Sequence, residues 1–179
     1  MKAIDVANFF IEVGKMNEGS EMTNARINKL LYFAQGWHLA KTGKPLFDEK
    51  IEAWEYGPVI SSVYQAFKNY GRNIIIETCG NFELDDVDDE TFDFLSDIFI
   101  NYYDCSTGAL ISLTHKNGSP WSRVYNQERH VTIPQNLMKE YFLSLPKLRT
   151  VQDELKDIPE IGYMNDDGYT VLPSEHGRD

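Results

Sequence analysis

The stretch RINKLLYFAQGWHLAKTGKPLFDEKIEAWEYGPV, residues Arg26–Val59, joins an aromatic-rich helical pattern to a short β-like segment. On a helical wheel the first part has two apolar faces. One is formed by Ile27, Leu30, Leu31, Ala34, Trp37 and His38, and the other, roughly opposite, by Tyr32 and Leu39. Two apolar faces predict a central helix over Met22–Lys41 that other elements contact from both sides. Gly36 would let one of them approach the backbone closely, and we expect Trp37 in the core.

Local signals mark where this helix and the next ones begin and end. Thr23 or Asn24 is the expected N-cap, and Gly43 the expected stop. Gly57-Pro58 predicts the start of another helix with proline at its first position. Apolar periodicity predicts further helices over residues 2–16, 88–104, 106–114 and, after Thr132, up to Leu145.

The β-like part predicts a small sheet. Leu46-Phe47 and Ile51–Tyr56, on either side of Asp48-Glu49-Lys50, suit the strands of a hairpin, and the β-branched residues 74–77 would add a third strand. The predicted fold is therefore mainly α, a compact single-domain helical fold with a small β-hairpin or three-stranded sheet at about residues 46–56 and 74–77. The pattern thins beyond Pro146. We expect the domain to span residues 1–146, and residues 147–179 to be a C-terminal extension that is partly disordered or loosely packed.

Composition limits the classes of partner. Seventeen Lys and Arg against 28 Asp and Glu give a formal charge of −11 at pH 7, whereas nucleic-acid binding needs clustered cations. The longest basic candidate, Lys139–Arg149, is thin, which argues against direct nucleic-acid binding and favours a basic protein partner. Asp5 and Glu12 interrupt the N-terminal apolar run, and no apolar stretch reaches the about 18 residues of a membrane span. Two cysteines suit a reducing compartment, so we expect a cytoplasmic protein without membrane association.

The sequence offers few groups for catalysis or metal binding. None of the four histidines pairs with another histidine or a cysteine at a metal-ligand spacing. In the acidic run LDDVDDE, counting from Asp86 puts Thr91 and Asp97 where an EF-hand loop needs glycine and glutamate, so the run predicts a helix start instead. Cys105 and His115 form the one nucleophile–base pair to consider, and nothing local orients it. We therefore predict no enzyme, no metal site and no cofactor.

The motif LTHKNGSPW, Leu113–Trp121, leaves two interpretations open. A helix end, an Asn117-Gly118 turn and a capped helix start at Ser119-Pro120 explain its residues structurally. His115 and Trp121 on a tight loop would also suit a binding surface. The residues alone favour the structural interpretation.

The hairpin also leaves two interpretations open, because alternation places Glu52, Trp54 and Tyr56 on one side and Ile51, Ala53 and Glu55 on the other. A small sheet packs one face on the helices and turns the other to water. If Ile51 and Ala53 face inward, Trp54 and Tyr56 form an aromatic anchor, with Glu52 beside it for a basic partner. If the larger aromatics face inward, they belong to the core. The candidate partner-binding residues are Glu52, Trp54, Tyr56, His115 and Trp121.

Three motifs together, INKLLYFAQGWHLAKTGKPLF, IEAWEYGPVISSVYQAF and LISLTHKNGSPW, closely resemble the Panacea domain, the SocA-like antitoxin family also described as phage-associated proteins. The resemblance covers about residues 3–145, with the motifs in the family's order. It implies a helical fold, a bacterial or prophage origin, and an antitoxin encoded beside a toxin that it neutralises mainly by protein–protein contact. The family supplies no catalytic residues to carry over.

Three functions therefore compete. The first is an interaction module, either an antitoxin that binds a cognate toxin from an adjacent gene or an adaptor that presents a client to a protease. The second is a hydrolase that uses Cys105 and His115, which the missing catalytic constellation opposes. The third is a DNA-binding autoregulator with a winged-helix-like arrangement, its wing the hairpin at residues 46–56, which the charge of −11 opposes.

Overall fold

The computed structural model describes residues 1–17, 19–127 and 130–146, together with the backbone of residues 163–164 and 170–171. The helices are α1 (Ala3–Lys15), α2 (Asn24–Thr42), α3 (Ser61–Phe67), α4 (Asp89–Tyr102), α5 (Thr107–His115), α6 (Pro120–Val124) and α7 (Gln135–Ser144), with short 3₁₀ turns η1 (Lys68–Tyr70) and η2 (Leu84–Asp86). The strands are β1 (Glu52–Trp54), β2 (Gly57–Val59), β3 (Val131–Thr132), β4 (Tyr163–Met164) and β5 (Thr170–Val171). The prediction of a mainly α fold with a small sheet is confirmed. The extension predicted for residues 147–179 lies outside the described residues, except for the antiparallel pair β4–β5.

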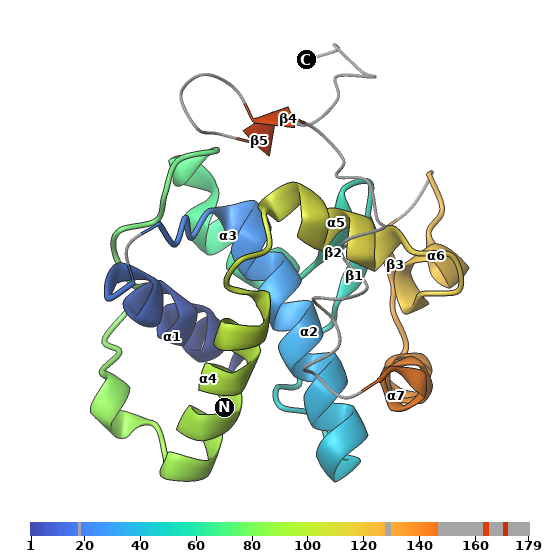
Figure 1. Cartoon of the computed structure of the whole chain (residues 1–179), viewed down its shortest axis with the longest axis horizontal. Coiled ribbons are helices and arrows are strands. Elements are labelled where there is room, and N and C mark those ends of the chain that lie inside the picture. Colours follow the sequence, from blue (N-terminus) through green and yellow to red (C-terminus); the bar gives the residue numbers. More distant parts are fainter. Residues whose placement is uncertain (18, 128–129, 147–162, 165–169, 172–179) are drawn as a thin grey trace.

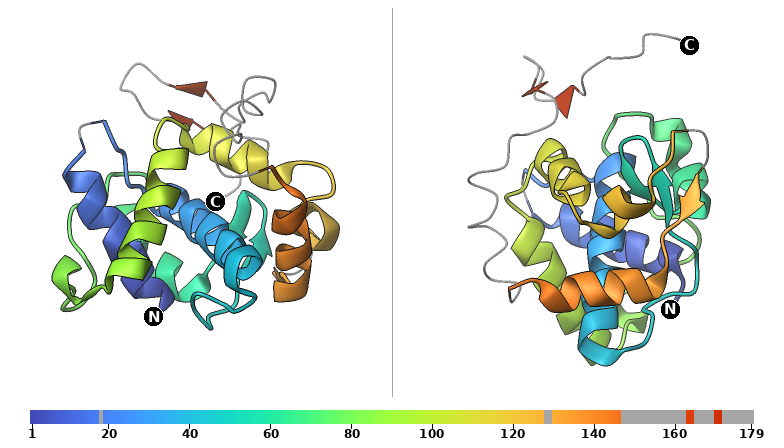
Figure 2. Two further views of the ribbon diagram at one scale, coloured as in Figure 1. Left: turned by 60° about the horizontal axis from the view of Figure 1, so that its bottom comes forward. Right: turned by 90° about the vertical axis from the view of Figure 1, so that its right-hand side faces the viewer.

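Helix α2 runs through the middle of the molecule, between α1 and α4 on one side and α7 on the other (Figure 1; Figure 2, left). It contacts α1, α3, α4, α5, α7 and β2, and every residue from Arg26 to Trp37 is buried. At its start, Thr23 Oγ1 accepts a hydrogen bond from the Arg26 N–H at 3.2 Å. At its end, Gly43 adopts a left-handed conformation with φ 75°. The predicted caps and the burial on both sides are therefore confirmed.

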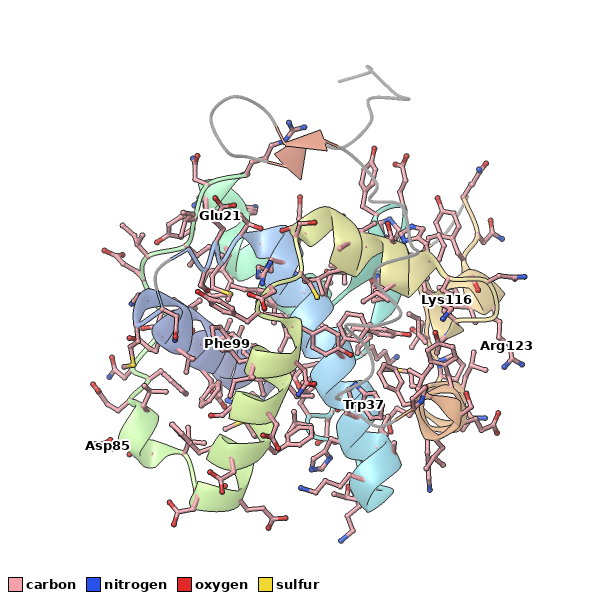
Figure 3. The ribbon with its side chains drawn as sticks, in the orientation of Figure 1. Glu21, Trp37, Asp85, Phe99, Lys116 and Arg123 are labelled. Carbon is pink, nitrogen blue, oxygen red and sulfur yellow. The ribbon has the colours of Figure 1, made fainter. Side chains whose placement is uncertain are left out.

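The close packing of α7 on α2 depends on Gly36. A Cβ atom at this position would lie 2.2 Å from the Phe142 ring, so a larger residue requires that α7 move. The same ring meets Trp37 edge-on, with 5.3 Å between the ring centroids. Trp37 lies on the side of α2 that faces α7 (Figure 3), is 8% exposed, and donates from Nε1 to the Tyr102 hydroxyl at 3.0 Å. Its predicted place in the core is confirmed.

Buried Arg26 ties α2 to the C-terminal end of α4. Its guanidinium donates to the carbonyl oxygens of Tyr102 at 3.1 Å, Tyr103 at 2.8 Å and Cys105. The last carbonyls of a helix lack partners within the helix and carry its negative dipole end. A buried cation at this point therefore adds hydrogen bonds to the carbonyl oxygens at this helix end and complements its negative dipole end.

The acidic run before α4 is a helix start, as predicted. The Asp88 carboxylate accepts from the Thr91 N–H at 3.0 Å, and this bond lowers the pKa of the carboxyl. Within the described residues, no group of three or more His, Cys, Asp or Glu side chains comes together as a metal site. None of the helices in that part of the chain is long and apolar enough to cross a membrane.

The hairpin lies further along the chain than predicted. The strand order is β2-β1-β3, and Trp54 pairs with Gly57 across a turn at Glu55-Tyr56. A hairpin turning at Asp48-Glu49-Lys50 is therefore wrong, and so is a helix beginning at Gly57-Pro58, because α3 begins at Ser61. Pro58 lies on the edge strand β2, where a residue without an N–H is tolerated.

The third strand also differs from the prediction. Strand β3 pairs with β1, and Thr132 lies opposite Glu52. Residues 74–77 do not join this sheet: Ile74 forms an isolated bridge with Thr23, and the Ile75 N–H donates to the Met22 carbonyl at 2.9 Å. The third strand predicted at residues 74–77 is therefore wrong, because the β-branched side chains of Ile74–Ile76 carry no information about which segment pairs with β1.

Candidate binding site at the β1–β2 hairpin

The hairpin turns its large aromatics outward. Ile51 and Ala53 are buried, as the outward interpretation requires, whereas Tyr56 is 39% exposed and Trp54 is half-buried. The Trp54 ring stacks on His130 with 4.3 Å between the ring centroids, and its Nε1 donates to the Glu52 carboxylate at 2.8 Å. The alternative that Trp54 and Tyr56 belong to the core is therefore wrong. The alternation of side chains along a strand placed Glu55 on the same side as Ile51 and Ala53. Glu55 is instead exposed, because it lies in the turn.

Three buried or half-buried side chains hold the backbone of this hairpin from behind. Trp121 Nε1 donates to the Trp54 carbonyl at 2.7 Å, and His115 Nε2 lies 3.0 Å from the Glu55 carbonyl. Lys29 Nζ donates to the Pro58 carbonyl at 3.0 Å. These donors come from α6, α5 and α2, so three distant segments set the position of one turn.

The motif LTHKNGSPW is a helix end followed by a capped helix, so the structural interpretation is confirmed. Ser119 Oγ accepts from the Ser122 N–H at 3.1 Å, with Pro120 in the first turn of α6. Trp121 is only 7% exposed and its ring stacks on Tyr125 at 4.4 Å. Because the indole N–H is already bonded to the hairpin, Trp121 supports the exposed aromatics from behind and has little surface left for a partner.

His115 faces a carbonyl oxygen with each ring nitrogen. Nδ1 lies 2.7 Å from the Ile111 carbonyl, and Nε2 lies 3.0 Å from the Glu55 carbonyl. A carbonyl only accepts, so a neutral imidazole can donate to one of them at a time and an imidazolium to both. Burial lowers the pKa of His115, although both hydrogen bonds oppose that effect. Because both ring nitrogens face backbone carbonyl oxygens, one of them in the hairpin, His115 helps to position the hairpin.

A groove of about 360 Å³ lies beside the exposed aromatics. Trp54 and Tyr56 of the hairpin, Tyr64 of α3 and His130 line its walls, and Lys29 and Asn28 of α2 also contribute. Asn28 is buried, and its Oδ1 accepts from the Ile60 N–H at 2.9 Å. A volume of this size is typical of ligand pockets. The groove thus combines aromatic walls, whose side chains have few rotatable bonds, with polar side chains from the central helix α2.

Sequence reasoning missed Lys29, Tyr64 and His130. Lys29 is 2% exposed, yet it lines the groove. Burial lowers its pKa from 10.5 to about 7. A helix with two apolar faces has few exposed positions, and this was the available signal that Lys29 could be buried. Nothing local indicated that Tyr64 and His130 would meet Trp54, because both lie at a distance along the chain.

Gly57 is required at the hairpin for two reasons. Its φ of 102° lies in the region that favours glycine. A Cβ atom there would also lie 2.8 Å from both Lys29 Cε and Thr114 Oγ1. The absence of a side chain therefore gives Lys29 the space to reach the hairpin backbone.

Cys105 and His115 do not form a catalytic pair. They lie at opposite ends of α5, whose nine residues span roughly 13 Å. Cys105 is buried, and burial raises the pKa of its thiol to about 11, which disfavours the reactive thiolate. The proposed hydrolase mechanism is therefore wrong for these two residues.

Comparisons with known proteins support the resemblance over a shorter segment than residues 3–145. The family described as "Antitoxin SocA-like, Panacea domain" matches residues 27–122, just over half of the chain. The chain is also similar to Antitoxin SocA of Caulobacter vibrioides (strain NA1000 / CB15N), with 28% identity over 114 residues. That alignment covers 59% of this chain and 61% of the relative's length. No solved structure matches significantly.

Proposed function

The chain belongs to the SocA-like antitoxin family with the Panacea domain, and on that premise we propose that it is an antitoxin that neutralises a toxin protein by binding it directly. The toxin is the product of an adjacent gene. It contacts the outward face of the β1–β2 hairpin, where Trp54, Tyr56 and Glu52 are displayed. The five candidate residues all lie within the matched segment.

The rigid display of Trp54 and Tyr56 supports this function most directly. Exposed aromatics on ordered backbone dominate binding hot spots, because they bury a large area at a small entropic cost. The hairpin that carries them is anchored by Trp121, His115 and Lys29. We assign His115 and Trp121 the role of positioning residues, and Glu52, Trp54 and Tyr56 the role of contacts.

The hairpin is poorly suited to be the wing of a DNA-binding protein. Residues 51–60, IEAWEYGPVI, contain two glutamates and no lysine or arginine. Contact with the phosphate backbone needs cations at the tip of a wing. The charges of this surface therefore favour a protein partner.

Co-expression with the product of the adjacent gene tests the function. The wild-type chain should restore growth of cells that produce this protein, and a pull-down should recover the two together. Tyr56→Ala and Trp54→Ala should each weaken binding, measured by titration calorimetry, by about 2 kcal/mol or more. Tyr56→Ala should leave the melting temperature nearly unchanged because Tyr56 is exposed. Trp54→Ala should lower it slightly, since its stacking on His130 is lost.

Phe92→Ala is the matched control, because Phe92 on α4 is 37% exposed and lies outside the groove. It should leave binding unchanged. Equal binding by wild type and both hairpin variants would refute the assignment of this surface. The amount of toxin protein in the same cells separates two modes: sequestration leaves it constant, whereas delivery to a protease lowers it.

A further inference from the structure

Lys29 is a buried amine with unused hydrogen-bonding capacity. An ammonium has three donors, and the Pro58 carbonyl is the one acceptor that Nζ reaches among the described residues. Among the described residues, no carboxylate lies within 4.0 Å of Lys29 Nζ. The ion pair observed in that part of the chain joins Lys15 and Glu12. A buried charge without a counter-ion is costly. The fold therefore keeps a polar group in an environment that favours its neutral form.

The groups that surround Lys29 do not supply the missing charge. The ionisable residues that line the same groove are Glu55 and Tyr56 of the hairpin, Tyr64 of α3 and His130 before β3. His115 of α5 also lies near enough for the charge of Lys29 to affect its pKa. Glu55 is exposed at the rim and makes no ion pair with Lys29. The pKa of His115 is lowered by burial and, to a smaller extent, by the nearby charge of Lys29. Among the described residues, therefore, no negative group balances the charge of a protonated Lys29.

We propose that Lys29 forms an ion pair with an aspartate or glutamate side chain of the bound protein, inserted into the groove that Lys29 lines together with Trp54, Tyr56 and Tyr64. This rests on the proposed function in one respect, that the toxin supplies the carboxylate. A single carboxylate matches one ammonium, and the aromatic walls contact the chain that carries it. A polyanion such as nucleic acid does not fit, because the exposed Glu55 lines the groove and the chain has a formal charge of −11.

Binding of the carboxylate must be coupled to the uptake of a proton by the Lys29 amine. The amine has a pKa of about 7 in the free protein, and only the ammonium attracts a carboxylate strongly. Ion pairing raises that pKa, so the complex takes up a proton above pH 7. The affinity should therefore fall about tenfold per pH unit above 7. A neutral ligand of the same shape should show no such fall.

Phenylacetate and its neutral isostere phenylacetamide test the site without a toxin. Lysine Cε and Nζ chemical shifts report their binding to the full chain between pH 6.5 and pH 9. Phenylacetate should bind about tenfold or more tightly than phenylacetamide at pH 7, and lose this advantage as the pH rises. Lys29→Met should abolish both the preference and its pH dependence. Equal affinities for the two probes, a preference independent of pH, or a preference that persists in Lys29→Met would each overturn the ion pair.

The pH profile of the wild type needs no variant, so the test does not depend on how Lys29→Met folds. Toxin binding forms the second arm, in which Lys29→Met should bind the adjacent gene's product about tenfold or more weakly at pH 7. A carboxylate preference together with no toxin binding by the wild type would refute the proposed function and retain the site. Equal toxin binding by wild type and Lys29→Met would overturn the assignment of the carboxylate to the toxin.

Discussion

Replacement of Lys29 by methionine should stabilise the folded protein at neutral pH. Methionine retains the length of the side chain without an ionisable group. The pKa of Lys29 falls from 10.5 to about 7 on folding, and each pH unit of difference corresponds to about 1.36 kcal/mol. Burial of this amine thus costs roughly 5 kcal/mol near pH 7. Loss of the hydrogen bond to the Pro58 carbonyl offsets about 1–3 kcal/mol of the gain. The expected net increase in the free energy of unfolding is about 2–4 kcal/mol.

The pH dependence of the wild type gives the sharper measurement. A group whose pKa is lower in the folded state contributes stability that is present above its unfolded pKa and is lost as the pH falls. Between 7 and 10.5 the unfolded chain binds more protons at Lys29 than the folded chain does, so stability rises with pH. From pH 7 to pH 9 the wild type should therefore gain about 2 kcal/mol relative to Lys29→Met.

Urea denaturation followed by tryptophan fluorescence at pH 7, 8 and 9 measures both effects. The comparison between variants removes contributions that they share, including the Cys105 thiol, whose raised pKa acts in the opposite direction. Lys44→Met is the matched control, because Lys44 is exposed, and it should follow the wild type at every pH. A wild type that gains no stability relative to Lys29→Met between pH 7 and pH 9 would refute the reasoning. So would a Lys29→Met variant that is less stable than the wild type at pH 7.

Three further predictions concern the α2–α7 contact and the support of the hairpin. Trp37→Ala should lower the free energy of unfolding by about 3–5 kcal/mol, because the ring is buried against Phe142; an unchanged urea midpoint would contradict its place in the core. Gly36→Ala should cost about 1–3 kcal/mol, since its Cβ atom would meet the Phe142 ring, and Phe142→Leu in the same chain should recover part of the loss; no recovery would mean that the contact is not the cause. Trp121→Phe should lower the free energy of unfolding by about 1–3 kcal/mol, because it leaves the Trp54 carbonyl unpaired. It should also speed amide hydrogen exchange in the hairpin, and unaltered exchange would show that Trp121 does not hold the hairpin in place.

The local signals in the sequence determined most of the helical fold. The two apolar faces of α2, its caps at Thr23 and Gly43, and the start of α4 at Asp88 all follow from interactions within a few residues along the chain. Such signals depend on the 3.6-residue period and on backbone groups that a neighbouring side chain can satisfy. For the same reason the motif around Ser119-Pro120 was interpreted correctly from its residues.

The tertiary structure alone decided the sheet and the groove. A strand is specified by the strands it pairs with, and β1 pairs with Gly57–Val59 and with Val131–Thr132. The local β propensity of residues 74–77 therefore led to a wrong prediction of the third strand. The burial of Lys29 is likewise a property of its surroundings, because the same lysine on a helix with one apolar face would reach water. The hairpin is placed where Lys29, His115 and Trp121 meet its carbonyl oxygens. Those contacts join residues that lie far apart between positions 29 and 121. Helical and strand periodicity relates only residues that are close along the chain, so the sequence pattern does not reveal these contacts.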